Sequence, residues 1–340
     1  MADSQPKDRS THEQWEDELQ QLQLSLPKEE WFKAPLCFYQ GFWCPTSIIY
    51  KEVSAFQNHF QATDTDLILA SLPKTGTTWL KSLIYTIVNR KNLSEISQHI
   101  LRSKNPHELV LHLEYKLYVN NQPDLTNIPS PRLFATHLPY STIPKSIKTS
   151  KCRIVYICRN PLDNFISVCH FWALFDMNKG IKLDMDMIEE HMHKYCKGIF
   201  PHGPYDDHLL GYWKESIENP QKVLFLEYEG LKKEPHAHLK KLADFMGYPF
   251  SEEEEKENVV DEILELCSLK NLKEMEVNKS GKFYPWFGNN TLFRKGEVGD
   301  WTNYLTPSMA KGFDEIHEKL KNAGFSFGYY DSNLLFEATK

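Results

Sequence analysis

The sequence predicts an α/β protein in which one domain holds a central, mostly parallel sheet flanked by helices. The main observation is a set of short apolar runs, most of them followed by a helical pattern. Buried strands that alternate with helices favour a parallel sheet covered on both faces. Two further observations agree with this class. Of the 340 residues 41% are hydrophobic, enough for a large core, and no linker-like stretch divides the chain.

Four apolar runs are predicted as strands of this sheet, at residues 67–70, 132–135, 153–157 and 223–226. Three of them lead into predicted helices, at residues 77–89, 162–174 and 235–246. Another helix is expected after Ser251, which can cap a first turn that carries four acids, Glu252 to Glu255. Ligands of such sheets bind beyond the carboxyl ends of the strands. Functional groups are therefore expected in the turns after Leu72, Ala135 and Ile157.

Residues 1–30 are predicted to form a flexible or partly helical arm, with a short helix at 13–24, ahead of a single domain over residues 31–340. This arm is polar and has no apolar signal-peptide core. No apolar run approaches the roughly 20 residues that a membrane span needs. The seven cysteines include no C-x-x-C pair and are expected to be reduced thiols. These features predict a cytoplasmic protein that does not bind membranes.

The charge balance argues against one broad class of partner. The formal net charge is −7 at pH 7, and the sequence pI is about 6.1. A general nucleic-acid binder needs a basic surface, so nucleic acid is not an expected partner. An anionic ligand would have to be held by a local pocket.

A candidate anion-binding loop, residues 72–79, directly follows the first predicted strand. Gly76 lets the backbone approach a ligand closely, and Thr77 and Thr78 begin a helix whose first N–H groups are free. The helix dipole favours an anion there, and Lys74 adds a full positive charge. A strand, a glycine-bearing loop and a helix in this order are typical of a P-loop-like nucleotide-binding core.

The loop does not match the two common nucleotide motifs. In the Walker A pattern, G-x-x-x-x-G-K-[ST], lysine follows the last glycine, whereas Lys74 precedes Gly76. Neither this pattern nor G-x-G-x-x-G occurs in the chain. An ATPase or a dinucleotide dehydrogenase is therefore disfavoured.

Four motifs, in this order, resemble those of the cytosolic sulfotransferases. They are LPKTGTTWL at 72–80, THLP at 136–139, YICRNPLD at 156–163 with Ser167 beyond it, and FRKGEVGDW at 293–301. Two more segments are similar to the plant branch of that family, YQGFW at 39–43 and GYW at 211–213. The resemblance extends from about residue 30 to the C-terminus. It implies a sulfotransferase whose sulfuryl donor is 3′-phosphoadenylyl sulfate (PAPS).

The resemblance also implies which residues bind this co-substrate. The 5′-phosphosulfate would be wrapped by Lys74, Thr75, Gly76, Thr77, Thr78 and Trp79. The 3′-phosphate would be held by Arg159, Ser167, Arg294, Lys295 and Gly296. Arginine suits this task because its rigid fork matches a phosphate in a bidentate manner. The adenine would be contacted by Trp79 and Tyr228.

His137 is the candidate catalytic residue, together with Lys74. It follows a predicted strand in a turn that ends at Pro139, at the edge of the sheet where ligands bind. Imidazole titrates near working pH, so it can accept a hydroxyl proton as the oxygen attacks sulfur. The resemblance implies that His137 is the general base and that Lys74 stabilises charge on the departing oxygen. Ala135 stands where animal members often carry a lysine, so more of that electrostatic role falls to Lys74.

No metal is expected, because lysine, arginine and helix N–H groups supply the positive charge. His191, His193 and Cys196 lie close together in one helical stretch, but they are not expected to form a metal site. Two other function classes stay open. A nucleotide kinase with a divergent phosphate loop would need acidic metal ligands, and a non-catalytic nucleotide-binding protein would not need His137.

The acceptor is predicted to be a small hydroxylated molecule. Aromatic pockets suit flat acceptors, and the aromatic residues outside the nucleotide motifs are Phe38, Tyr39, Phe42, Trp43, Phe171, Trp172, Tyr205 and the cluster at 283–287. Acceptors of the plant branch are flavonoids, brassinosteroids, hydroxyjasmonate and desulfoglucosinolates. Among these a flavonoid is favoured.

The chain is expected to be a monomer. Many animal members dimerise through K-x-x-x-T-V-x-x-x-E, which follows the last motif. The corresponding residues here are Thr302, Thr306, Pro307 and Lys311, so that only the threonine is retained. Pro307 removes a backbone donor and Lys311 reverses a charge. A two-fold interface repeats each loss on both subunits.

Overall fold

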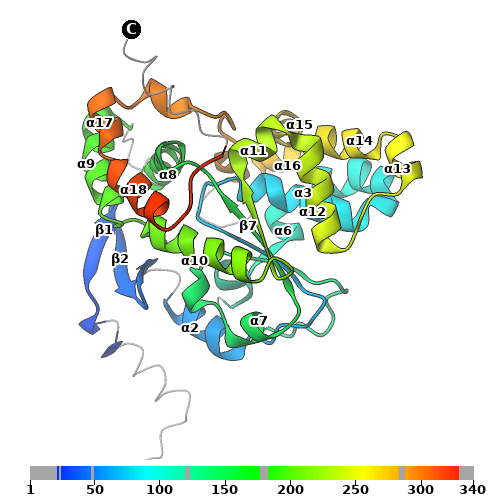
Figure 1. Cartoon of the computed structure of the whole chain (residues 1–340), viewed down its shortest axis with the longest axis horizontal. Helices are drawn as coiled ribbons and strands as arrows, with labels where there is room; N and C mark the ends of the chain where they lie inside the picture. The colour runs from blue at the N-terminus through cyan, green and yellow to red at the C-terminus, as the bar shows by residue number, and fades with distance from the viewer. Residues whose placement is uncertain are drawn as a thin grey trace, which may run out of the picture.

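A five-stranded parallel sheet lies at the centre of the protein, with helices on both of its faces (Figure 1). The computed structural model describes residues 21–22, 24–46, 50–118, 123–176, 183–282 and 288–328. The strand order in the sheet is β5 (Leu111–His112), β6 (Leu133–Thr136), β4 (Leu67–Ser71), β7 (Arg153–Cys158) and β8 (Val223–Glu227). Each pair of neighbouring strands runs parallel, which confirms the predicted α/β class.

Alternate residues of the strands face two separate hydrophobic cores. In β4, Leu67 and Leu69 belong to one core, whereas Ile68 and Ala70 belong to the other. The first core is covered by the helices toward the right of Figure 1, α3 (Thr77–Asn89), α12 (Pro235–Met246) and α14 (Val259–Leu266). The second core is covered by α8 (Pro161–Asp176), α10 (Tyr205–Glu218) and α18 (Asp314–Asn322).

Further helices connect these elements. Before β7 they are α2 (Tyr50–His59), α4 (Leu93–Glu95), α5 (Leu101–Ser103), α6 (Pro106–Leu109) and α7 (Lys145–Thr149). After β7 they are α9 (Met185–Cys196), α11 (Tyr228–Lys233), α13 (Glu252–Lys256), α15 (Leu269–Glu274), α16 (Glu276–Ser280) and α17 (Pro307–Lys311).

The four strands predicted from apolar runs are all present, with ends that differ by at most one residue. The helices predicted at 77–89 and 235–246 have these bounds, and the helix predicted at 162–174 begins one residue earlier and ends two residues later. Ser251 caps α13 as predicted, because its hydroxyl accepts from the Glu254 N–H while Glu254 accepts from the Ser251 N–H. β5 is not predicted, because a strand of two residues is too short to show a periodic pattern.

A second, antiparallel sheet is built near the N-terminus from β1 (Lys28–Trp31), β2 (Ala34–Tyr39) and β3 (Phe42–Pro45). β1 begins at Lys28, so the last three residues of the predicted arm belong to this sheet. Their exposed, charged side chains give no strand pattern. Residues 1–20 and 23 lie outside the described part of the chain, and so does most of the helix predicted at 13–24.

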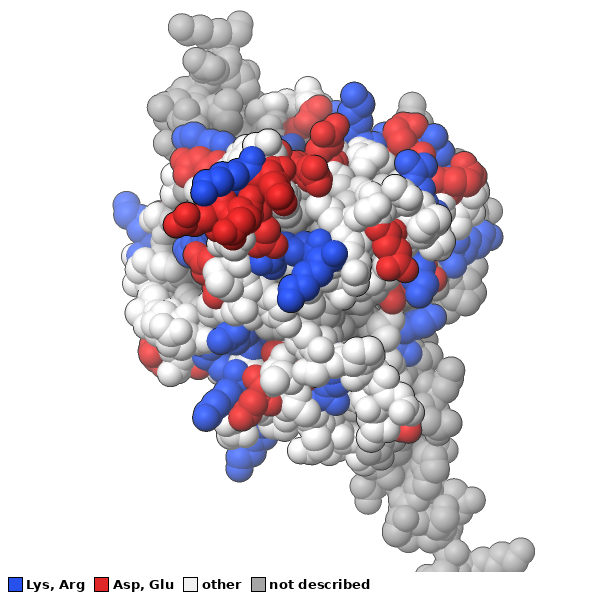
Figure 2. All heavy atoms as spheres, turned by 90° about the vertical axis from the view of Figure 1, so that its right-hand side faces the viewer, with Lys and Arg blue, Asp and Glu red and all other residues white. Residues whose placement is uncertain are grey.

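Two features of the described residues bear on partners. None of their helices is both long and apolar enough to span a membrane. The face that Figure 2 shows carries acidic and basic side chains side by side, in keeping with the net charge of −7.

Candidate active site

A cavity that opens to solvent lies beyond the carboxyl ends of β4 and β6. It is the place at which a parallel sheet is expected to bind ligands. Most of the predicted site residues line it, namely Lys74, Gly76, Thr77, Thr78, Trp79, His137, Ser167, Tyr228, Arg294 and Gly296. The walls are completed by residues from other segments, among them Pro45, His107, His112, Tyr115, Phe171 and Trp172.

Three predicted residues support this cavity without lining it. The hydroxyl of Thr75 donates to the Leu72 carbonyl at 2.9 Å, so this buried side chain holds the loop rather than a ligand. Arg159 packs against Tyr228, with its guanidinium carbon 4.7 Å from the centre of that ring. Lys295 is engaged with Asp300.

The turn before α3 requires glycine at position 76. Gly76 has φ of +110°, which L side chains rarely adopt, and a Cβ there would lie 2.7 Å from Tyr228 Cδ2. The Ser71 and Thr77 hydroxyls are 2.9 Å apart and tie the end of β4 to the first turn of α3. Thr77 and Thr78 line the cavity at this helix start, where N–H groups without intrahelical partners can bind an anion.

Lys74 is the basic residue of this loop, and it lines the cavity. Its Nζ lies 4.4 Å from the centre of the Phe171 ring. Burial, together with the positive charges of Arg294 and Arg159, lowers the pKa of Lys74 to about 7. A bound anion would favour the charged form of Lys74.

His137 lies one residue beyond β6, and its ring is held so that Nε2 is the nitrogen left for a ligand. Its Nδ1 lies 2.6 Å from the Ser71 carbonyl oxygen, which can only accept, so Nδ1 carries the proton. Its main chain is fixed by Glu114, which accepts from the N–H, and by His208, whose Nε2 donates to the carbonyl at 3.0 Å. Burial lowers the pKa of His137 to about 3. The ring is therefore neutral at working pH, and Nε2 keeps the lone pair that a general base needs.

A segment that the sequence motifs do not mark, residues 105–118, supplies one wall of the cavity. His107 Nε2 lies 3.0 Å from the Thr78 hydroxyl, and its Nδ1 lies 3.2 Å from Nζ of the buried Lys81. Lys81 also donates to the Val110 carbonyl at 2.8 Å. This network ties the first turn of α3 to residues 105–118 and holds the Thr78 hydroxyl in place at the cavity.

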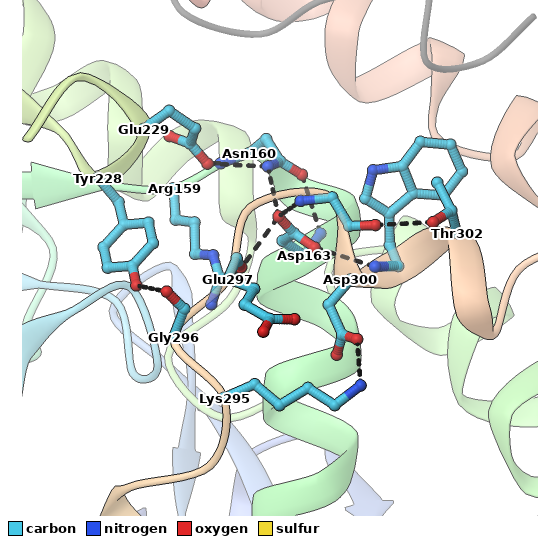
Figure 3. Close-up of polar contacts among 12 residues, drawn as sticks. Arg159, Asn160, Asp163, Tyr228, Glu229, Lys295, Gly296, Glu297, Asp300 and Thr302 are labelled. Atoms are coloured by element: carbon cyan, nitrogen blue, oxygen red, sulfur yellow. Dashed lines mark hydrogen bonds and ion pairs between the residues drawn. The ribbon is translucent and has the colours of Figure 1, made fainter. Parts of the chain in front are cut away.

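Arg159 and Asp163 hold the C-terminal motif in place (Figure 3). Arg159 donates to the Glu297 carbonyl and lies 3.3 Å from the Asp163 carboxylate. Asp163 in turn accepts from the N–H of Gly299 at 2.8 Å and from the N–H of Trp301 at 3.0 Å. The motif over 293–301 is therefore clamped to the start of α8, beside Arg159.

The cations of the C-terminal motif are held by Asp300. Arg294 contacts Asp300 at 2.5 Å and Lys295 contacts it at 2.6 Å. Although burial opposes it, hydrogen bonds from Lys295 and Arg294 lower the pKa of Asp300 to about 2. Among the described residues, the buried N–H groups without a hydrogen-bond partner include three that belong to the predicted nucleotide-binding residues: Arg159 Nε, Arg294 Nε and Trp79 Nε1. Unpaired buried donors are costly, so these groups fit an anionic ligand.

Several residues considered from the sequence have other roles. His191 accepts from the Phe32 N–H at 3.1 Å and bonds to the Met187 carbonyl at 2.8 Å, so both ring nitrogens serve the backbone. No cluster of three metal-ligating side chains occurs in the described ranges. Tyr205 is a correction to the aromatic set, because it is buried and donates to the Arg159 carbonyl. Phe171 and Trp172 do line the cavity, and residues 283–287 lie outside the described chain.

Comparison with known proteins finds a family model and relatives that match most of this chain. Residues 64–324 match the Sulfotransferase domain family. Arabidopsis thaliana cytosolic sulfotransferase 15 is 45% identical over 316 residues, which cover 91% of this chain and 87% of the relative. Cytosolic sulfotransferase 14 of the same plant is 44% identical, with coverage of 91% and 90%.

Solved structures show the same fold. An Arabidopsis thaliana protein described as a steroid sulphotransferase superposes with a TM-score of 0.72 at 36% identity, over 96% of this chain and 100% of that one. A mouse sulfotransferase in complex with PAP (adenosine 3′,5′-bisphosphate) superposes with a TM-score of 0.62 at 26% identity. The match covers 89% of this chain and 97% of the mouse chain.

Proposed function

Because this chain belongs to the cytosolic sulfotransferases, PAPS-dependent enzymes, we propose that it moves the sulfuryl group of PAPS to a hydroxyl of a small phenolic acceptor, with His137 as general base. One observation carries the proposal. The free Nε2 lone pair of His137 opens on the same cavity as the anion-binding loop over 72–79. A proton acceptor and a phosphate site in one cavity are what sulfuryl transfer to a hydroxyl requires.

The residues fit PAPS as co-substrate. The N-terminal turn of α3 and Lys74 suit the 5′-phosphosulfate, while the unpaired donors of Arg159 and Arg294 suit the 3′-phosphate. PAP, held by a mouse relative, is the nucleotide that PAPS leaves after transfer. Bound there, PAPS supplies the activated sulfuryl group.

The protein's own part in the reaction is positioning and charge. His137 Nε2 takes the proton from the hydroxyl group of the acceptor molecule. The hydrogen bond from Nδ1–H to the Ser71 carbonyl keeps the ring in place as it becomes charged. Lys74 and the Thr78 hydroxyl, aligned through His107, stabilise negative charge near the departing oxygen. Positioning and electrostatics are also the main contributions in phosphoryl transfer.

The assay that tests this function uses labelled PAPS, a panel of phenols and excess EDTA. We expect transfer to phenol with EDTA present, because Lys74, Arg159 and Arg294 supply the positive charge. A nucleotide kinase would instead lose activity with its Mg²⁺. No aspartate or glutamate is among the described residues that line the cavity, so no observation favours the kinase. Absence of transfer to every phenol would contradict the proposal.

The acceptor is proposed to be a flat phenol, with a flavonoid as the favoured candidate. Phe171, Trp172 and Tyr115 line the cavity and offer aromatic contacts to such a molecule. The relatives are named as cytosolic enzymes, and we propose the same compartment for this chain.

Donor binding is expected to depend on pH through Lys74. Its pKa of about 7 in the free protein leaves it mostly neutral at about pH 8, and a bound phosphate favours the charged form. Binding of adenosine 3′,5′-bisphosphate at that pH should therefore take up a proton. Affinity should fall by up to about tenfold per pH unit as pH rises above 7. Calorimetry in two buffers of different ionisation enthalpy measures this uptake, which Lys74→Met should abolish. A heat that does not depend on the buffer in the wild type would contradict the expectation.

The protein is proposed to be a monomer. Pro307 is the first residue of α17, and the Thr306 hydroxyl accepts from the Met309 N–H at 3.2 Å. The one motif residue that this chain retains is thus engaged in capping its own helix. Light scattering at micromolar concentration should give a mass near 39.9 kDa. A mass of twice that value would contradict the proposal, and a dimer formed by Thr302→Lys, Pro307→Val and Lys311→Glu together would support its reasoning.

A further inference from the structure

His112 is a second imidazole beside the catalytic one. Across the β5–β6 pair it lies opposite Ala135, two residues before His137. The rings of His112 and His137 have centroids 4.4 Å apart and planes tilted by 41°. Both rings line the cavity, so a molecule in contact with His137 also lies next to His112.

The His112 ring is buried and lacks hydrogen bonds. It is 1% exposed, and neither ring nitrogen has a hydrogen-bond partner among the described residues. Its Nδ1 faces the Glu114 carboxylate at 3.9 Å, beyond hydrogen-bond distance. Glu114 does not line the cavity, so Nε2, on the opposite side of the ring, is the nitrogen left for a ligand.

An unpaired imidazole is costly in such a place. A buried donor or acceptor without a partner loses its hydrogen bonds to water and gains none in return. Burial, and the nearby cations and histidines, lower the pKa of His112, so the ring is neutral. A neutral imidazole has one donor and one acceptor nitrogen, and either can pair with a hydroxyl, which also donates and accepts.

We propose that His112 is a specificity-determining residue that hydrogen-bonds a second acceptor oxygen adjacent to the hydroxyl being sulfated. The inference rests on the proposed function, since it places the reacting hydroxyl on His137. Two side-by-side imidazoles match two oxygens on neighbouring carbon atoms. For a flat phenol this means an ortho-dihydroxy ring, so the preferred substrate class is the catechols.

The test compares matched acceptors, 4-methylcatechol and 4-methylphenol, at saturating PAPS. The variant is His112→Phe, which keeps an aromatic ring and removes both nitrogens. We expect the catechol-to-phenol ratio of kcat/KM to fall by about 5- to 10-fold, the size of one lost hydrogen bond. His112→Gln, which restores a donor and an acceptor, should recover part of the ratio.

Two controls separate a binding role from a structural one. His193→Phe changes an exposed histidine outside the cavity and should leave the ratio unchanged. Adenosine 3′,5′-bisphosphate affinity should be the same in wild type and His112→Phe, which shows that the site is intact. If His112→Phe leaves the catechol-to-phenol ratio of kcat/KM unchanged, whether or not both rates fall, the inference is wrong. If the wild type sulfates neither phenol, the proposed function itself has failed.

Discussion

Replacing His137 with alanine is expected to lower kcat by about 10²- to 10⁴-fold, the usual contribution of a positioned general base. The reason is the fixed tautomer. Nδ1–H is committed to the Ser71 carbonyl at 2.6 Å, so Nε2 alone can take the acceptor proton.

The fold and the nucleotide site should survive this substitution. His137 is anchored mainly through its backbone, to Glu114 and His208, and alanine keeps these contacts. Adenosine 3′,5′-bisphosphate should therefore bind His137→Ala with wild-type affinity in calorimetry. Added imidazole should restore part of the turnover by occupying the space of the missing ring. Near-normal turnover of His137→Ala with a good acceptor would rule out the general-base role.

The pH profile offers an independent check on His137. Burial holds its pKa at about 3, far below the ordinary value near 6.5, so the base stays unprotonated down to acidic pH. The acid limb of kcat/KM should then lie below about pH 5. An acid limb near 6.5 would mean that the reacting group is a solvated imidazole.

Replacing Arg159 with alanine is expected to weaken binding of adenosine 3′,5′-bisphosphate by about 10- to 100-fold, which corresponds to about 1.5 to 3 kcal/mol for a hydrogen bond to a charged group. Arg159 has a buried Nε with no hydrogen-bond partner among the described residues and is braced by Asp163 and the Glu297 carbonyl. A guanidinium that is already held in place and has an unpaired N–H loses little conformational entropy when it binds phosphate.

The discriminating comparison is with adenosine 5′-monophosphate, which lacks the 3′-phosphate. Wild-type protein should bind the bisphosphate far more tightly, and Arg159→Ala should reduce this gap while its affinity for the monophosphate stays nearly constant. Arg102→Ala, an exposed arginine away from the cavity, serves as the matched control and should change neither affinity. Equal wild-type affinity for the two nucleotides would contradict a 3′-phosphate site.

Local patterns alone determined the architecture and the central loop of this protein. The apolar runs place four of the five strands to within one residue, because a buried parallel strand must be apolar on both faces. The glycine and threonines over 76–78 mark the anion-binding turn, since its chemistry lies in consecutive residues. The motif around His137 was sufficient to place that residue at the end of a strand, and the structure has it one residue beyond β6.

Only the tertiary structure decided which distant side chains meet. Thr75 belongs to the loop motif but turns inward, whereas Tyr228 comes from another strand end and closes on Gly76. Asp163 reaches the N–H groups of residues 299 and 301, 136 and 138 positions away. His112 sits on a two-residue strand with no pattern of its own, yet lies beside His137. The hydrophobic periodicity of a segment predicts which face of its own helix or strand is buried, and not which other element covers that face. The pairing of elements, which sets these contacts, depends on packing of the whole chain.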